Sequence, residues 1–299
     1  MNNKQFKKIT LEAEKGMMFE MTETSDGLLI RAINILRKAE YIGDYTKPPI
    51  PEGYSYIEGQ WNSGYVIQDK QGNQFVWVPV GSLPANGTLD GENFIEKFGR
   101  RNYRDIEFLE SEFHDEMDDM LKKQFESIQK YGGFYISRYA ISKSKNDKPA
   151  SVKGEKPWTD INFDDAVKEA KKLGQGNVQS HLVYGAEFDS TLQWLIETGK
   201  PVGQIAKDST KWGNYCNCEN SPQQVVKTGS REEWYANNIA DLAGNVWEWT
   251  QEAKNSSYRV LRGGSYYRNG INTPVAYRTY YSTDYYLNLI GFRVALYIE

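Results

Sequence analysis

The sequence predicts a protein that combines β-strands with α-helices, and three patterns lead to this expectation. Two β-rich runs within residues 65–80 flank a turn near Gly72, which is typical of a β-hairpin. Residues 134–141 form a further apolar, β-rich run. Residues 163–173 and 187–198 each place apolar side chains at helical spacing and are followed by a glycine. The chain is therefore expected to mix both kinds of element.

The N-terminal residues are predicted to form a separate helical arm. Residues from about 10 to 40 carry apolar side chains at roughly the period of a helix. The proline-rich residues 47–51 then stiffen the chain into an extended linker. We therefore divide the chain into a helical arm, residues 1–46, and a main domain, residues 47–299. The arm either packs on the main domain or serves for attachment or oligomerisation.

Further signals place helix boundaries inside the main domain. An acidic segment near residues 106–130 is predicted to be helical and to end at Gly132. Asn162 has the side chain of a good N-cap for the helix that follows it. The helices over residues 163–173 and 187–198 are expected to be scaffold.

Composition and charge indicate a soluble globular protein and argue against two kinds of partner. The chain has 299 residues, of which 39% are hydrophobic, so it can bury a large core. Its net charge of −4 argues against general nucleic-acid binding, which needs a basic face. No apolar run reaches the length of a membrane span, and the N-terminus lacks the apolar stretch of a secretory signal. We therefore expect synthesis in the cytoplasm and no direct insertion into a membrane.

Three short motifs lie near the C-terminus. They are G-N-V-W-E-W at residues 244–249, R-V-L-R-G-G-S at residues 259–265 and G-F-R at residues 291–293. Together they resemble the motifs of the formylglycine-generating enzyme (sulfatase-modifying factor) superfamily, and weaker similarity extends over residues from about 50 to 299. The resemblance implies the irregular C-type-lectin-like α+β fold of that superfamily, with many ordered loops.

Catalytic members of the superfamily hold a copper ion through two cysteines that follow the G-G-S motif. In this chain the matching positions are Arg268 and Thr273. Copper(I) needs soft thiolate ligands, which neither side chain provides. The chain's two cysteines, Cys216 and Cys218, both precede the motif. We therefore expect no copper and no formylglycine formation.

A second branch of the superfamily, the ergothioneine-type sulfoxide synthases, holds iron through three histidines. This chain has only His114 and His181, so that ligand set cannot be assembled. An enzyme with an unrecognised cofactor is kept as the alternative to a binding protein. A pocket lined by titratable groups would favour the enzyme, whereas a flat, exposed aromatic patch would favour the binding protein.

The motif at residues 244–249 belongs to a calcium loop in the superfamily. The resemblance implies Ca²⁺ ligands from the side chains of Asp241 and Glu248 and from the backbone carbonyls of Gly244 and Val246. Hard oxygen ligands of this kind suit Ca²⁺ in a structural site. The alternative is that these residues are scaffold only, with the two tryptophans of the motif buried.

Tyrosine dominates the stretch between the last two motifs. Seven of the chain's 21 tyrosines lie between positions 266 and 286, and six of them form adjacent pairs. Adjacent residues of an extended chain point to opposite faces, so one ring of each pair is expected outside the core. Tyrosine suits recognition because it brings a large contact area and a hydroxyl with few torsions to order.

This stretch resembles the variable region of diversity-generating retroelement proteins, which end in R-x-x-R-G-G-S, a variable segment and G-F-R. The resemblance implies a non-catalytic protein that binds a protein or surface ligand, with the phage virion or the cell surface as its final place. The alternatives are a fixed tyrosine-rich segment of the fold, and a structural virion or surface component. The candidate ligand-binding residues are Tyr267, Arg268, Tyr280, Tyr281, Asp284, Tyr285, Tyr286 and Asn288.

Overall fold

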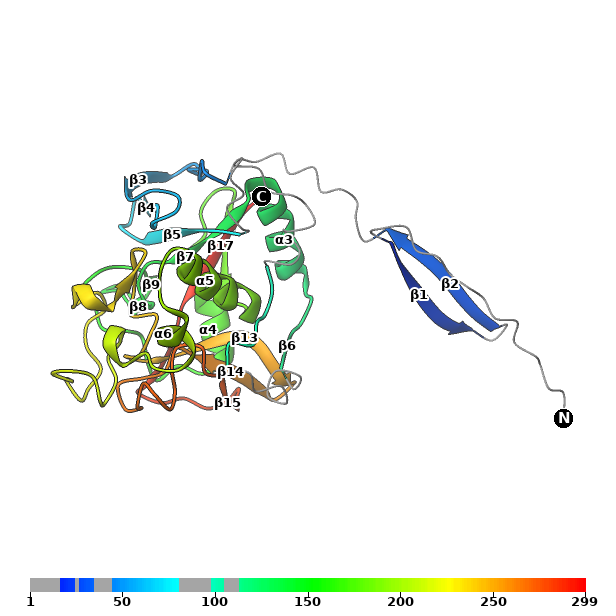
Figure 1. The fold of residues 1–299 in the computed structure, drawn as a ribbon. Coiled ribbons are helices and arrows are strands. Elements are labelled where there is room, and N and C mark those ends of the chain that lie inside the picture. The colour runs from blue at the N-terminus through cyan, green and yellow to red at the C-terminus, as the bar shows by residue number, and fades with distance from the viewer. Residues whose placement is uncertain (1–16, 25–26, 35–44, 81–97, 105–112) are drawn as a thin grey trace. The chain divides into compact units, whose positions relative to one another are not determined.

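The computed structural model describes residues 17–24, 27–34, 45–80, 98–104 and 113–299. The chain divides into two compact units, Met1–Glu40 and Tyr41–Glu299. Figure 1 shows both units.

The N-terminal unit contains a β-hairpin and not the predicted helix. Strands β1 (Met17–Thr24) and β2 (Gly27–Asn34) pair in antiparallel register from Met17 opposite Asn34 to Thr24 opposite Gly27. The helical prediction over residues 10–40 is therefore wrong where the structure describes the chain. A short apolar run fits the period of either element, and the two eight-residue segments satisfy their backbone groups by pairing with each other.

The proline-rich residues 47–51 belong to the larger unit. The Trp77 indole nitrogen donates to the Tyr45 carbonyl at 3.2 Å, and the Tyr135 hydroxyl donates to the Pro49 carbonyl at 2.7 Å. Tyr45 is buried in the hydrophobic core. The chain is thus already part of the larger unit at Tyr45, one residue before the end of the predicted arm.

A six-stranded sheet is the largest sheet among the described residues of the larger unit. The order of its strands is β10-β17-β7-β5-β4-β3, and each strand pairs antiparallel with the next. The predicted hairpin over residues 65–80 is confirmed by β4 and β5, and the run at residues 134–141 contributes the shorter strand β7. The strands are β3 (Tyr54–Glu58), β4 (Val66–Asp69), β5 (Gln74–Pro79), β7 (Gly133–Ser137), β10 (Val178–Leu182) and β17 (Val294–Ile298).

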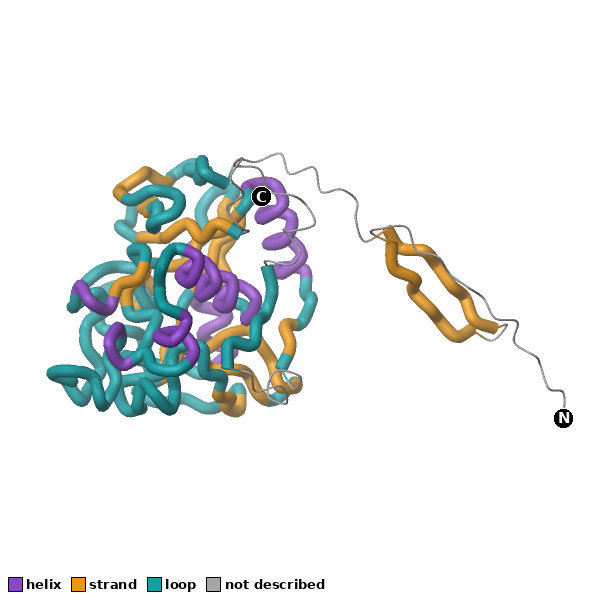
Figure 2. Tube along the Cα trace, in the orientation of Figure 1, coloured by secondary structure: helices purple, strands orange, loops and turns teal. Residues whose placement is uncertain are grey.

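A second sheet, in the order β15-β14-β13-β16, carries the C-terminal motifs. Its strands β13 and β16 run parallel, and β6 pairs with the far end of β13. Two short ladders, β8 with β9 and β11 with β12, lie outside the two large sheets, and loops make up much of the remainder (Figure 2). The bounds are β6 (His114–Asp115), β8 (Ser142–Lys143), β9 (Pro149–Ala150), β11 (Tyr235–Ala236), β12 (Ile239–Ala240), β13 (Trp247–Asn255), β14 (Tyr258–Arg262), β15 (Thr279–Ser282) and β16 (Ile290–Phe292).

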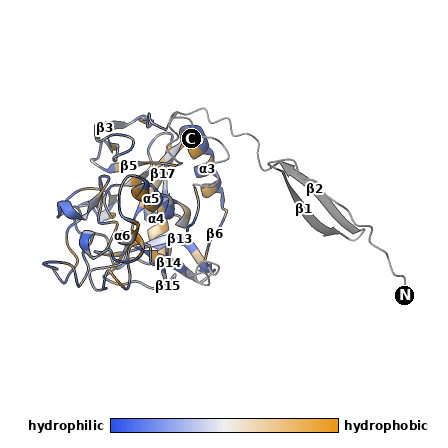
Figure 3. Ribbon diagram, viewed as in Figure 1, coloured by the Kyte–Doolittle hydropathy of each residue, from blue (hydrophilic) through white to orange (hydrophobic). Residues whose placement is uncertain are grey.

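The helices begin and end close to the predicted signals. Helix α3 starts at Asp119, later than predicted, and ends at Gly132 in a left-handed conformation; residues 105–112 lie outside the described residues. Asn162 caps α4 by accepting from the Asp165 amide, as predicted. Helix α5 is mostly buried, and its hydropathy colours in Figure 3 are mixed because buried polar residues such as Glu187 and Asp189 alternate with apolar ones. The helices are α3 (Asp119–Tyr131), α4 (Phe163–Ala170), α5 (Gly185–Glu197) and α6 (Val202–Ala206).

The core of the larger unit lies on both sides of the six-stranded sheet. One cluster joins β5 to α5 through side chains such as Val78 and Leu192. The other joins the two sheets through Trp77 and Trp249. Among the described residues, no helix combines the length and the apolar character needed to cross a membrane.

Candidate ligand-binding face

The segment that contains most of the candidate residues, Arg278–Asn288, is anchored along its backbone. Its first half forms the edge strand β15, in which Tyr280 lies opposite Val260 of β14. Beyond the strand, the Thr283 carbonyl accepts from the Phe163 amide and the Leu287 carbonyl accepts from the Asp160 amide, each at 3.1 Å. We call residues 278–288 the tyrosine segment. Its backbone is held by β14 on one side and by the start of α4 on the other.

Three of its four candidate tyrosines are exposed. The exposed fraction is 62% for Tyr286, 43% for Tyr285 and 37% for Tyr280. Tyr281 is half-buried and stacks on Tyr285, with ring centroids 4.9 Å apart and an interplanar angle of 17°. Asp284 and Asn288 are also exposed.

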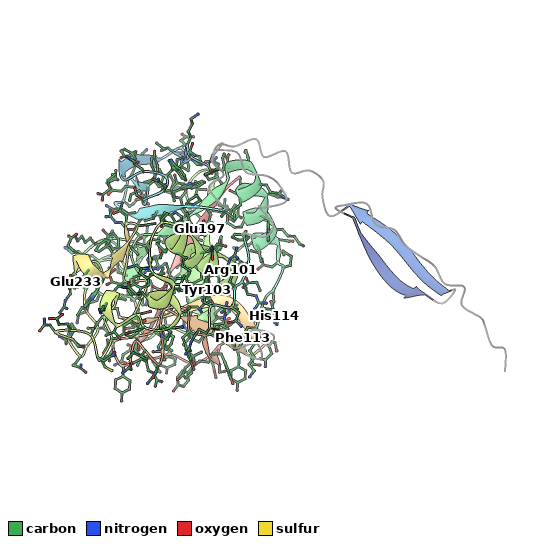
Figure 4. The ribbon with its side chains drawn as sticks, viewed as in Figure 1. Arg101, Tyr103, Phe113, His114, Glu197 and Glu233 are labelled. Carbon is green, nitrogen blue, oxygen red and sulfur yellow. The ribbon has the colours of Figure 1, made fainter. Side chains whose placement is uncertain are left out.

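Residues from other elements surround Tyr280, and sequence analysis did not single them out. The Lys254 ammonium lies 4.1 Å from the centre of the Tyr280 ring and donates to its hydroxyl at 3.0 Å. The rings of Tyr258 and Phe113 lie 5.7 and 5.8 Å away. Phe113 and its neighbour His114 are labelled in Figure 4. Lys254 and Tyr258 flank the turn between β13 and β14. They lie beside Tyr280 because β14 pairs with β15, and the sequence alone did not reveal this pairing.

The other two candidate residues lie in a separate loop. Tyr267 is 68% exposed and Arg268 is exposed as well. The Arg268 carbonyl accepts from the Cys216 amide at 2.9 Å, and the Tyr267 ring contacts that of Tyr266. Within the described part of the chain, neither residue makes a hydrogen bond or ring contact with residues 280–288. The structure therefore does not join them to the tyrosine segment by contact.

A buried network of charges fixes the start of the tyrosine segment. Arg262 of β14 donates to Asp189 of α5 at 2.6 Å, and Arg278 donates to Glu252 of β13 at 2.9 Å. Arg278 also pairs with Asp189, and Arg262 lies 3.4 Å from Glu252. Burial alone would raise the pKa of Asp189, but the charges of the two arginines outweigh it and hold that pKa below its usual value. Four crossed ion pairs thus join β13, β14, α5 and the residue before β15.

Residues 98–104 close this network from the other side. The Arg101 amide donates to Asp189 at 2.9 Å and the Tyr103 hydroxyl donates to the Asp189 carbonyl at 2.7 Å; both residues are labelled in Figure 4. Arg100 lies 3.2 Å from Glu252. Nearby, burial and then the charge of Glu252 raise the pKa of Asp115 to about 7, although its carboxylate accepts two amides at the start of α5.

The predicted calcium loop places its two carboxylates in buried positions. Asp241 accepts from the Thr228 hydroxyl at 2.8 Å and from the Gly229 amide at 2.7 Å, and its other oxygen is buried without a hydrogen-bond partner. Glu248 pairs with Arg293 of the G-F-R motif at 3.0 Å. Burial raises the pKa of both carboxyl groups, while these partners act in the opposite direction.

The fit of this loop to a cation is therefore partial. The free oxygen of Asp241 is suited to a cation or a water molecule, but Arg293 already neutralises Glu248. Gly244 and Val246 are the residues whose carbonyls were expected as further ligands. The Gly244 Cα packs against the backbone of Asn214, and the Val246 carbonyl lies near Gly263. In the described residues, no group of three or more histidine, cysteine, aspartate or glutamate side chains is arranged to hold a metal.

Comparison with known proteins identifies the family of the larger unit. Residues 66–298 match the Sulfatase-modifying factor enzyme 1-like domain. The chain belongs to this family. Its fold is accordingly the α+β, C-type-lectin-like fold of formylglycine-generating enzymes, as predicted. No curated protein matches the chain.

Several solved structures resemble this family member at low sequence identity. "Treponema denticola variable protein 1" gives a TM-score of 0.40 at 15% identity, over 55% of this chain and 84% of that one. PvdO from Pseudomonas aeruginosa gives 0.47 at 14% identity, over 78% and 98%. The "Major Tropism Determinant U1 Variant" gives 0.38 at 12% identity, over 97% and 75%. At such identities and scores, no role is carried from these proteins to this chain.

Proposed function

We propose that this protein is a non-catalytic ligand-binding member of the sulfatase-modifying factor family, and that the tyrosine segment is its binding face. The observation that carries the proposal is the exposure of Tyr280, Tyr285 and Tyr286 on a backbone that is hydrogen-bonded on both sides. A segment that is already ordered loses little conformational entropy on binding, and exposed aromatic rings supply contact area.

The contacts of several buried carboxylates in the described residues favour the binding protein over the alternative of an enzyme. A cavity of about 870 Å³ lies beside the β4–β5 turn, but the Asp69 carboxylate in its wall is already saturated. Asp69 accepts from the Gln71 and Asn73 amides and from the side chains of Asn73 and Gln175. Asp189, Glu248 and Glu252 are engaged with arginines, and the Asp115 carboxylate accepts two amides at the start of α5. These pairings favour scaffold roles over acid–base chemistry.

The partner and location follow from the same proposal. We propose a protein or surface ligand, a face whose sequence is diversified by a retroelement, and a place on a phage virion or cell surface. The order of the C-terminal motifs and the Tyr, Asp, Ser, Thr and Asn content of residues 280–288 support this. Attachment or oligomerisation through residues 1–46 belongs to the proposal as well. An adenine-specific near-repeat of the encoding DNA, beside a reverse transcriptase gene, would support diversification, and its absence would argue against it.

Replacement of exposed tyrosines tests whether their rings belong to the surface or to the core. The free energy of unfolding of the variant Tyr285→Ser/Tyr286→Ser is expected to lie within about 1 kcal/mol of that of the parent, because exposed side chains contribute little to stability. The buried Tyr135→Ser is the matched control and is expected to cost about 3–5 kcal/mol, as other truncations of buried aromatic residues do. Urea unfolding measures both. Equal losses in the free energy of unfolding for the two variants would mean that the tyrosine segment is part of the core.

Calcium binding at Asp241, Gly244, Val246 and Glu248 stays a proposal, supported by the unpartnered oxygen of Asp241. A ligand that binds only the native state raises the melting temperature by mass action. We expect 1 mM Ca²⁺ to raise Tm relative to chelator, and Asp241→Asn to remove that rise. An unchanged Tm in Ca²⁺ and in chelator would leave both carboxylates as scaffold.

A further inference from the structure

A second aromatic hollow lies on a different element of the larger unit. Its volume is about 330 Å³. It lies at β3, the edge strand of the six-stranded sheet, whereas the tyrosine segment borders the other sheet at the opposite end of this unit in Figure 1. The hollow is lined by Thr46, Pro48, Tyr56, Gly59, Gln60, Trp61 and Tyr65.

Three of these residues form an aromatic wall. The rings of Tyr56 and Tyr65 lie 4.9 Å apart with an angle of 38° between them. Tyr56 is 49% exposed, while Trp61 and Tyr65 are half-buried against the core. Tyr56 is fixed because its hydroxyl donates to the Gly59 carbonyl at 3.0 Å. The wall therefore has a fixed shape.

The hollow also presents hydrogen-bond donors. In the part of the chain that the structure describes, the Trp61 indole nitrogen, the Tyr65 hydroxyl and the Gln60 side-chain amide make no hydrogen bond. An indole N–H can only donate, and phenol and amide groups donate readily. A ligand that offers acceptors next to flat or apolar rings is therefore suited to this hollow.

The protein already uses this chemistry on its own proline-rich segment. Pro48 lines the hollow, and a phenol binds the carbonyl of the next residue, Pro49, while an indole binds a carbonyl three residues before Pro48. The Trp77 indole donates to the Tyr45 carbonyl and the Tyr135 hydroxyl donates to the Pro49 carbonyl. Proline lacks an N–H, so a run of prolines exposes carbonyl acceptors and apolar rings with no donor to satisfy.

We propose that this hollow binds a proline-rich segment of another polypeptide in the polyproline II conformation. Such segments are extended before they bind, so little conformational entropy is lost, and they dock into grooves lined by aromatic side chains. Tyr56, Tyr65 and Trp61 supply the rings, and Trp61, Tyr65 and Gln60 supply donors to the carbonyls. This site is separate from the tyrosine segment, and its ligand is recognised by backbone carbonyls and pyrrolidine rings.

Decaproline is the probe for this site. We expect calorimetry to show saturable binding of decaproline to the full chain, and none of a ten-residue Gly-Ser peptide. Trp61→Phe keeps a ring but removes the N–H, and is expected to weaken binding about fivefold, or about 1 kcal/mol, the contribution of one hydrogen bond. Tyr56→Ser removes an exposed ring of the wall and is expected to weaken it about tenfold or more.

Val202→Ser is the control, because it removes an exposed apolar side chain elsewhere and is expected to leave decaproline binding unchanged. If Trp61→Phe lowers Tm markedly, its weaker binding could reflect loss of the fold, and Tyr56→Ser alone then tests the site. No saturable decaproline binding, equal binding of the Gly-Ser peptide, or binding unchanged by Tyr56→Ser would each overturn the proposal. Binding of cellohexaose without binding of decaproline would also overturn it and assign the aromatic wall to a sugar.

Discussion

Arg262→Met is expected to destabilise the protein by about 3–5 kcal/mol, the usual cost of removing one partner from a buried ion pair. Asp189 and Glu252 are fully buried; Asp189 would lose one of its two arginines, and Glu252 one of its three. Desolvated carboxylates cannot recover that interaction from water. Urea unfolding at constant pH measures the change in the free energy of unfolding.

The matched control is Lys122→Met, which removes an exposed ion pair with Asp119. Surface pairs of this kind contribute about 0–1 kcal/mol. If Arg262→Met costs no more than Lys122→Met, the buried network does not hold the start of the tyrosine segment. A large loss for Arg262→Met alone is the expected result, because Arg262 shares both of its buried carboxylate partners with Arg278.

Gly264→Ala is expected to destabilise the protein by about 2–5 kcal/mol, from backbone strain and steric overlap together. Gly264 has φ of 82°, and an added Cβ would lie 2.6 Å from the Tyr215 ring and 3.0 Å from the Thr273 carbonyl. Tyr215 is fully buried and its hydroxyl donates to the Gly263 carbonyl at 2.8 Å, so it cannot move aside. Thermal and urea unfolding measure the loss.

Gly72→Ala separates strain from overlap. Gly72 has φ of 89°, but an added Cβ there meets no atom within 4 Å. This variant should therefore show the strain alone, about 1–3 kcal/mol. Equal losses at the two positions would mean that the G-G-S motif needs glycine for its backbone conformation only, and not for close packing against Tyr215.

Local sequence signals predicted the elements that depend on local chemistry. The β4–β5 hairpin, the cap at Asn162 and the end of α3 at Gly132 all follow from turn and capping residues. The family followed from three short motifs. The N-terminal helix was wrong because residues 17–24 and 27–34 stabilise each other as paired strands, and the period of a short apolar run does not reveal a pairing partner.

The surroundings of the candidate face could not be predicted, because they join residues that are distant in sequence. Arg262 lies 73 residues from Asp189, and Arg100 lies 152 residues from Glu252. Lys254 reaches Tyr280 only because β14 pairs with β15. Tyr267 and Arg268 were grouped with the tyrosine segment by their place in the sequence, but the structure places them in the loop beside Cys216.

Selection from a displayed library tests the central claim most directly. The library randomises Tyr280, Tyr281, Asp284, Tyr285, Tyr286 and Asn288 in the full chain and is panned separately against hen lysozyme and streptavidin. If the tyrosine segment is a binding face on a rigid scaffold, different clones will bind each target, with Tm within about 4 °C of the parent. Loss of the fold in most clones, or folded clones that yield no target-specific binder, would contradict the account.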